Sequence, residues 1–162
     1  MRQKLSNRVA VVLIWGALCL ALVTACAPQG QAQETAPATN HSFGAAAMAI
    51  GQTSRANMAS YSDPDQFPPG TVCGIIVNYF AADGTLLTSP FRGVLDIGKT
   101  IFVDLNRNSL KAPVNRVPFR VVVSVIGNPN FPPDPCAAVR ATVEIYDNLT
   151  GRTTVFIDDP GQ

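Results

Sequence analysis

The chain contains 162 residues, with 12 Lys and Arg against 11 Asp and Glu and a formal net charge of +1. This near-neutral balance argues against a general nucleic-acid binder, which would carry a basic excess, and against an acidic disordered tail. Charged residues make up 14% of the chain, below the roughly 25% of typical soluble domains, and long apolar strands in a small domain account for the difference.

The beginning of the chain has the layout of a signal peptide. Three basic residues, Arg2, Lys4 and Arg8, precede an apolar run over 9–23, and small residues then lead to Cys26. A charged segment, an apolar segment and a small-residue processing site in this order are typical of secretory leaders. The run is shorter than the about 20 apolar residues that a permanent transmembrane helix needs. We therefore expect residues 1–25 to be a removable leader.

The segment Val23-Thr24-Ala25-Cys26 resembles the lipobox of bacterial lipoproteins. The resemblance implies that Cys26 is acylated and becomes the first residue of the mature chain, anchored to a membrane outside the cytoplasm. Each buried methylene contributes about 0.8 kcal/mol, so several acyl chains make release negligible. Ala27 stands where an aspartate would retain a lipoprotein in the inner membrane. The resemblance thus implies the outer membrane in a two-membrane bacterium, and the outside of the only membrane in a single-membrane one.

Two other fates of the leader stay open. Ala25-Cys26-Ala27 and Gly30-Gln31-Ala32 both fit the small-x-small pattern of ordinary signal-peptidase cleavage, which would give a secreted protein. An uncleaved leader would remain as a signal anchor. Once Arg2, Lys4 and Arg8 are removed, 9 basic residues remain against 11 acidic ones, a net charge of −2.

Residues 26–70 are expected to form the acylated N-terminus and a flexible tether. From Ala27 to about Gly70 the residues are mostly Ala, Gln, Thr, Ser, Asn, Gly and Pro. A segment with so few large apolar side chains cannot bury enough surface to offset its ordering entropy. Phe43, Ala47 and Ile50 stand at helical spacing, so a short helix is the alternative to a linker there.

Residues 71–160 are expected to form a β-domain. The predicted strands are 72–81, a segment from Phe91 through Leu95 to Ile97, 100–105, 117–126, 139–146 and 153–157. The run 72–81 is apolar nearly throughout, which is the pattern of a strand buried on both faces or crossing a core. The alternation is clearest in 139–146, where one side of the strand is apolar and the other polar. The apolar side is Val139, Ala141, Val143 and Ile145, and the polar side is Arg140, Thr142, Glu144 and Tyr146.

The spacing of these strands predicts the fold class. No helical segment between them is long enough for a crossover, which excludes a parallel α/β sheet. The expected fold is therefore all-β, a small antiparallel immunoglobulin-like sandwich of about six or seven strands. The chain departs from antibody-type domains because its one tryptophan, Trp15, lies in the signal peptide.

Two stretches carry a further resemblance. Ala82-Asp83-Gly84 and the run from Glu144 to Thr153, EIYDNLTGRT, resemble segments of the broad class of secreted bacterial proteins that consist of a single sandwich. These motifs are mainly turn chemistry. The resemblance therefore implies a fold and transfers no active site.

The cysteines predict one disulfide. Cys19 leaves with the signal peptide and Cys26 is assigned to lipid, so Cys73 and Cys136 remain as an even pair in an oxidising compartment. A bridge between them would stabilise the fold by roughly 4 kcal/mol on the chain-entropy model. Two buried free thiols are the alternative. A redox or metal-binding pair would need closer spacing or partner ligands.

Catalytic and metal chemistry have little support in the sequence. The single histidine, His41, lies in the expected tether, and a mobile linker cannot hold a base against a nucleophile or an imidazole in a metal shell. The acidic pairs are interpreted as solvated turn and strand-end residues, and a weak calcium site that includes Asp134 stays open. These pairs are Asp63 with Asp65 and Asp158 with Asp159. We predict no catalytic residue, no metal ligand and no cofactor.

The local charge feature of the body is basic. It consists of four residues spread over a loop with Pro and Asn: Arg107, Lys111, Arg116 and Arg120. Such a group could contact phospholipid headgroups, an anionic envelope polymer or an acidic partner. The simpler interpretation is a solvated loop that keeps the domain soluble and protects a sheet edge.

Three functions remain open from the sequence. The favoured one is a non-catalytic binding module of the bacterial envelope, tethered to the membrane through its lipid and docking a protein or polymer, with no nucleic-acid partner. The second is a structural or accessory subunit of an envelope complex. The third is a secreted enzyme or metal protein. Fold analogy cannot choose among them, because sandwiches host many functions.

Overall fold

The computed structural model describes residues 38–127 and 131–158, and these residues form eight β-strands and three short 3₁₀ helices. The strands are β1 (Ala38–Ala49), β2 (Gln52–Ser60), β3 (Val72–Ala81), β4 (Phe91–Asp96), β5 (Thr100–Asn106), β6 (Arg116–Ile126), β7 (Val139–Asp147) and β8 (Thr153–Asp158). The 3₁₀ helices are η2 (Pro64–Gln66), η3 (Arg107–Ser109) and η4 (Pro135–Ala138). Among the described residues, no helix has the length and apolar character needed to cross a membrane.

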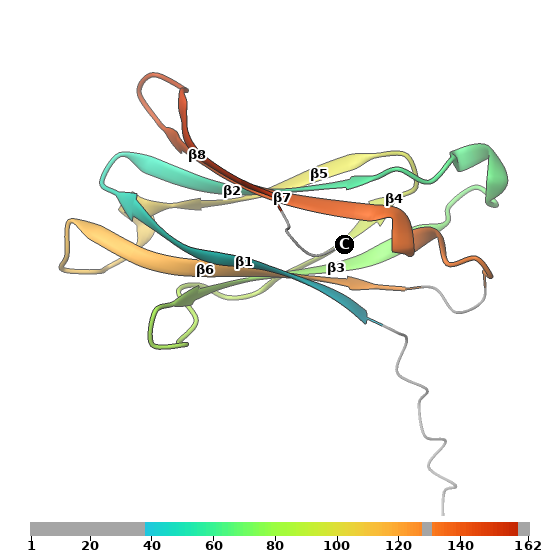
Figure 1. The fold of residues 1–162 in the computed structure, drawn as a ribbon, viewed down its shortest axis with the longest axis horizontal. Coiled ribbons are helices and arrows are strands. Elements are labelled where there is room, and N and C mark those ends of the chain that lie inside the picture. Colours follow the sequence, from blue (N-terminus) through green and yellow to red (C-terminus); the bar gives the residue numbers. More distant parts are fainter. Residues whose placement is uncertain (1–37, 128–130, 159–162) are drawn as a thin grey trace, which may run out of the picture. The chain divides into compact units, whose positions relative to one another are not determined.

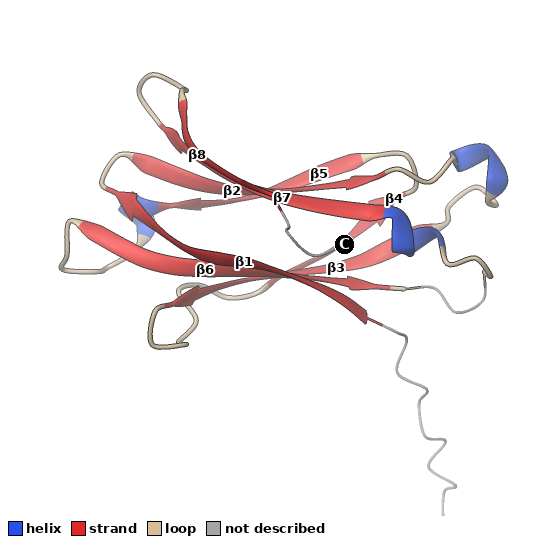
Figure 2. Ribbon diagram, in the orientation of Figure 1, coloured by secondary structure: helices blue, strands red, loops and turns tan. Residues whose placement is uncertain are grey.

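The eight strands form two antiparallel sheets that stack as the layers of a sandwich (Figures 1 and 2). One sheet has the order β1-β6-β3-β4 and the other the order β5-β2-β7-β8. The all-β sandwich expected from the sequence is therefore confirmed. The expected count of six or seven strands was too low, because two strands lie upstream of the predicted domain.

Alternation of buried and exposed residues explains how the sequence forms these layers. In β7 the residues Val139, Ala141, Val143 and Ile145 are all buried, as predicted from their period of two. In β3 the buried positions are likewise every second one, from Cys73 to Tyr79, and the positions between them are partly exposed. Of the two alternatives expected for 72–81, burial on both faces is therefore wrong, because only one face of its sheet packs against the other sheet.

The β-domain begins earlier in the chain than predicted, because β1 and β2 occupy residues 38–60. Phe43, Met48 and Met58 are each at most 1% exposed, so these two strands supply large side chains to the core. The expectation of a flexible segment up to Gly70 is wrong for these residues, and the sandwich begins at Ala38. The alternative helix around Phe43 is also wrong.

A β-bulge explains why β1 was missed. The register of β1 against β6 shifts between Phe43 and Ala46. Such a bulge adds a residue to one strand and reverses which positions face inward. Buried residues accordingly fall on odd numbers before the bulge (His41, Phe43) and on an even number after it (Met48). No single alternation of apolar and polar residues therefore runs through the segment. Its many small residues also weaken the sequence pattern by which a strand is predicted.

The predicted disulfide is confirmed. Cys73 of β3 and Cys136 of η4 are joined at an S–S distance of 2.15 Å, with their Cα atoms 5.6 Å apart. Both residues are buried. Since β3 belongs to one sheet and η4 leads directly into β7 of the other, the bridge fastens the two layers together near one end of the sandwich.

Candidate functional site

Of the four basic residues predicted to contact an anion, Arg107 is buried and binds the backbone of its own loop instead. It lies in η3 with only 3% of its surface exposed. Its guanidinium donates hydrogen bonds to the backbone carbonyls of Leu110 and Ala112, both at 3.2 Å, and to that of Val114. Arg107 therefore holds the loop between β5 and β6 in place, and its assignment as a surface contact is wrong.

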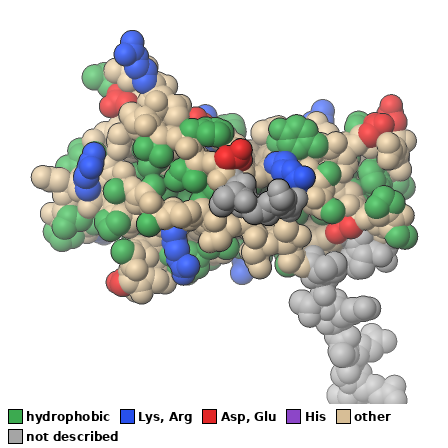
Figure 3. Space-filling model, in the orientation of Figure 1, with side chains coloured by type: hydrophobic (Ala, Val, Ile, Leu, Met, Phe, Trp, Pro, Cys, Tyr) green, Lys and Arg blue, Asp and Glu red, His purple; other side chains and the backbone are tan. Residues whose placement is uncertain are grey.

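The other three basic residues are exposed. Lys111 lies in the loop after η3, and Arg116 and Arg120 lie on the outward side of β6. The Arg120 guanidinium stands 4.9 Å from the centre of the Phe80 ring. On the side of the molecule drawn in Figure 3, Lys and Arg side chains lie apart from one another and form no single patch. These residues remain predicted contacts for an anionic partner.

The structure also places His41 and two of the acidic residues weighed in the sequence, Asp63 and Asp134. His41 lies in β1 and is 2% exposed, so its assignment to a solvated tether is wrong. Asp63 and Asp134 cap the short helices η2 and η4, accepting hydrogen bonds from the backbone N–H groups of Asp65 at 3.0 Å and Cys136 at 2.9 Å. Asp159 lies outside the described residues. Within those residues, no group of three or more His, Cys, Asp or Glu side chains is placed to hold a metal ion.

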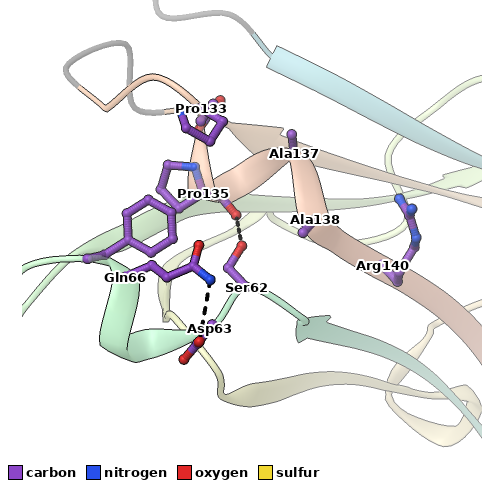
Figure 4. Close-up of a pocket in the computed structure, with 10 residues that line it drawn as sticks. Ser62, Asp63, Gln66, Pro133, Pro135, Ala137, Ala138 and Arg140 are labelled. Carbon is purple, nitrogen blue, oxygen red and sulfur yellow. Dashed lines mark hydrogen bonds between the residues drawn. The ribbon is translucent and has the colours of Figure 1, made fainter.

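A hollow of about 350 Å³ lies beside these two caps (Figure 4). It is lined by Ser62, Asp63, Gln66, Phe67, Pro133, Asp134, Pro135, Ala137, Ala138 and Arg140. The Ser62 hydroxyl donates to the Pro135 carbonyl at 2.6 Å, which ties its two walls together. In Figure 4, Pro133 and Pro135 lie together on one side and Arg140 lies apart from them. Because both Asp caps are engaged by backbone groups, we interpret this hollow as part of the loop scaffold.

The outer face of the β5-β2-β7-β8 sheet carries the more organised cluster. We call it the Arg55 face and define it by Arg55, Phe102, Asp104, Glu144, Tyr146 and Phe156. Cross-strand pairing places Asp104 of β5 and Glu144 of β7 on either side of Arg55 in β2. Arg55 Nε and Nη2 donate to the two carboxylate oxygens of Asp104, each at 2.8 Å. Such a bidentate pair fixes the plane of the guanidinium.

Two aromatic rings complete the environment of Arg55. Its guanidinium carbon lies 4.2 Å from the centre of the Phe102 ring and 5.1 Å from that of Tyr146. Both distances are within the range of cation–π attraction. The hydrogen bonds that Arg55 donates to Asp104 raise the pKa of Arg55 above its ordinary value, so the guanidinium stays charged. Arg55 is thus held by a carboxylate and two rings at once.

Glu144 belongs to the same network. Its carboxylate accepts hydrogen bonds from Thr153 Oγ1 at 3.0 Å and from Asn57 Nδ2 at 3.4 Å. A hollow of about 260 Å³ lies here, lined by Arg55, Glu144, Tyr146, Gly151 and Thr153. Phe156 of β8 pairs directly with Glu144 and is 62% exposed, while Phe102 is 59% exposed. The face therefore joins fixed charged groups to two solvent-exposed rings.

The sequence revealed only part of this face. The alternation of β7 correctly placed Glu144 and Tyr146 on its polar side, and that assignment is confirmed by their partial exposure. Arg55 was missed because it lies in the segment expected to be a tether. The available signal was the alternation in β2, where Ala56 and Met58 are buried and Arg55 and Asn57 are not.

Comparisons with known proteins add little to this description. No protein-family model matches the chain, and no curated protein matches it. A solved structure, the crystal structure of Thermotoga maritima 1070, aligns with a TM-score of 0.44 at 12% sequence identity. The alignment covers 74% of this chain and 90% of that one.

Proposed function

We propose that this chain is a non-catalytic binding module of a bacterial envelope, tethered outside the cytoplasm by acylation of Cys26. The observation that carries the proposal is the Arg55 face, where charged groups are fixed by hydrogen bonds beside the exposed rings of Phe102 and Phe156. Aromatic residues and arginine are the types enriched at binding surfaces.

The position of the first strand sets the length of the connection to the membrane. Eleven residues separate Cys26 from Ala38, where β1 begins. At 3.3–3.6 Å per residue, that chain reaches at most about 40 Å. The sandwich would therefore stay close to the membrane surface, within reach of partners embedded in it or lying on it.

Capture from the native envelope tests the binding function. The full-length protein is crosslinked in its own envelope, purified, and analysed by mass spectrometry together with what it retains. A specific protein or polymer should be retained, and Phe102→Ser combined with Phe156→Ser should reduce its recovery. Leu149→Ser is the matched control, since Leu149 is 94% exposed in the β7–β8 hairpin.

Two outcomes would change the proposal. One dominant protein in constant ratio, recovered regardless of the Phe102 and Phe156 variants, would make the chain an accessory subunit that uses another surface. Recovery of no specific molecule would contradict a binding function. The tether is tested separately: Cys26→Ala should move the protein from the membrane to the soluble fraction, and persistent membrane association would mean that the leader remains as an anchor.

A further inference from the structure

We propose that the ligand of the Arg55 face is a neutral glycan, bound across the sheet by ring stacking and by hydrogen bonds to its hydroxyls. This inference rests on the proposed binding function and names its ligand class. Three properties of the face support it: its mixture of donors and acceptors, its charge, and the separation of its exposed rings.

The hydrogen-bonding groups of the face suit a polyol. A hydroxyl can donate one hydrogen bond and accept two, so a sugar needs acceptors and donors side by side. Asp104 and Glu144 supply carboxylate acceptors and Arg55 supplies donors, while the Tyr146 hydroxyl already donates to Asp104 at 3.3 Å. The Arg55 and Asp104 side chains are 30% and 34% exposed, so they retain surface for a ligand while their geometry is fixed. Fixed groups lose little conformational freedom on binding.

The charge of the face disfavours an anionic ligand. The positive charge of Arg55 is balanced by Asp104 at 2.8 Å, and Glu144 adds a carboxylate next to them. A phosphate or an acidic polymer would meet this additional negative charge and would have to compete with Asp104 for the guanidinium. A neutral glycan is neither repelled by Glu144 nor required to displace Asp104, because an uncharged hydroxyl can hydrogen-bond to a carboxylate or a guanidinium group.

The exposed rings extend the surface beyond a single sugar. Phe102 lies on β5 and Phe156 on β8, the two edge strands of the sheet. Their cross-strand partners Asn57 and Glu144 point outward, so both rings belong to the Arg55 face. Three strand spacings, about 14 Å, separate them across the sheet, and the register offsets them by two residues along the strands, since Phe102 is level with Thr142 and Phe156 with Glu144. An aromatic ring offers an apolar face with a partial negative charge to the C–H groups of a sugar ring. Two rings at this separation favour a chain of sugars.

The hollow lined by Arg55, Glu144, Tyr146, Gly151 and Thr153 has the composition of one sugar subsite. Tyr146 supplies an aromatic wall, Arg55 and Glu144 supply a donor and an acceptor, and Thr153 supplies a hydroxyl. Gly151 forms the remaining wall, and nothing lies within 4 Å of where its Cβ would be. Small-molecule sites commonly combine an apolar wall with a few placed polar groups.

Affinity electrophoresis tests the proposal. The full chain is run in native gels containing hydroxyethyl cellulose, glycol chitin or laminarin as neutral polysaccharides and polygalacturonate as an anionic one. The detergent must have no sugar headgroup. We expect at least one neutral polysaccharide to retard the protein. Phe102→Ala with Phe156→Ala should weaken the association about tenfold or more, as expected for aromatic residues that dominate an interface, and Glu144→Gln should weaken it as well.

Arg120→Ala is the matched control. Arg120 also stands over a phenylalanine, Phe80, but on the outer face of the opposite sheet. This variant should leave the retardation unchanged, and urea unfolding of each variant confirms that binding is compared between folded proteins.

Three results would overturn the proposal. These are retardation by no neutral polysaccharide, retardation unaffected by the Phe102 and Phe156 variants, and retardation lost in Arg120→Ala. If envelope crosslinking instead captures a protein through Phe102 and Phe156 while no polysaccharide binds, the glycan is excluded and the proposed binding function stands.

Discussion

Arg55 of β2 and Asp104 of β5 face each other across two neighbouring strands and form a bidentate ion pair with both N···O distances at 2.8 Å. The pair lies at the surface, with about a third of each side chain exposed. Exposed ion pairs contribute little to stability, typically up to about 1 kcal/mol. Its role is therefore better explained by the ordering of the outer face than by stabilisation of the fold.

This relationship predicts a small effect of mutation on stability. Asp104→Asn should lower the free energy of unfolding by about 0.5–1 kcal/mol, because the exposed pair is screened by solvent. Arg55→Lys should cost a similar amount, since a lysine cannot form the bidentate contact. Urea unfolding of both single variants and the double variant measures the coupling. A coupling well above 2 kcal/mol would mean that the pair has a structural role.

The disulfide should carry more of the stability. Cys73 and Cys136 are 63 residues apart in sequence and join the two layers. Replacing both with serine should lower the free energy of unfolding by roughly 4 kcal/mol on the chain-entropy model. The unreduced protein should show no free thiol from this pair under denaturing conditions. Two titratable thiols, or an unfolding midpoint that is insensitive to reductant, would contradict the bridge.

The strands from Val72 onward could be predicted because the pattern of apolar and polar side chains in each of them is typical of a β-strand. The apolar run of β3 and the strict alternation of β7 need no tertiary context, and their predicted limits agree with the structure to within one residue. The strands β1 and β2 could not be found in this way. In β1 the bulge after Phe43 reverses the alternation, and most of its other residues are small or polar.

The candidate site was predictable only in part for the same reason. Glu144 and Tyr146 were placed on the correct side of β7, but their partner Arg55 lies in the strand that was missed. The prediction that Arg107 contacts an anion was wrong for a different reason. Its partners are the backbone carbonyls of its own loop, and a sequence contains no local pattern that distinguishes such an arginine from a solvated one.

The corrected start of the domain predicts that β1 is essential for folding. Phe43→Ala should lower the free energy of unfolding by about 3–5 kcal/mol, because it removes a buried aromatic side chain. Ile50→Ala is the control, since Ile50 is 65% exposed in the β1–β2 turn, and it should change stability by less than about 0.5 kcal/mol.

The same point can be tested by shortening the chain. A chain limited to residues 71–162 should show neither a cooperative unfolding transition nor protection from protease, because its two sheets lack β1 and β2. Cooperative unfolding of that shorter chain would mean that the first two strands are dispensable.

Arg107 should stabilise the loop between β5 and β6. Arg107→Ala removes the hydrogen bonds to Leu110, Ala112 and Val114, and we expect it to lower the free energy of unfolding by about 3 kcal/mol. Lys111→Ala, an exposed cation in the same loop, should change it by less than about 0.5 kcal/mol. Chemical denaturation measures both. Equal effects of the two variants would show that Arg107 does not hold the loop.

The β7–β8 hairpin should respond to acid through Asp147. One carboxylate oxygen accepts hydrogen bonds from the backbone N–H groups of Thr150 at 2.8 Å and Leu149 at 3.0 Å, and from the Thr150 hydroxyl at 3.0 Å. The hydrogen bonds from Thr150 contribute most, and together they lower the pKa of Asp147 below the ordinary 3.8. A carboxylate with a depressed folded-state pKa binds protons more weakly in the folded chain than in the unfolded one. Its stabilising effect is therefore complete above the unfolded pKa and is lost as the pH falls through the folded pKa.

The corresponding measurement is an NMR titration of the Asp147 carboxyl carbon, together with the unfolding free energy as a function of pH. We expect the Asp147 midpoint to lie below 3.8. In Asp147→Asn the unfolding free energy should decrease less steeply as the pH falls below about 4, because the variant has no carboxylate to protonate at this position. Thr150→Val removes the hydroxyl donor and should return the midpoint toward its ordinary value while keeping the hairpin. An Asp147 midpoint at or above 3.8 would show that these hydrogen bonds do not favour the ionised form.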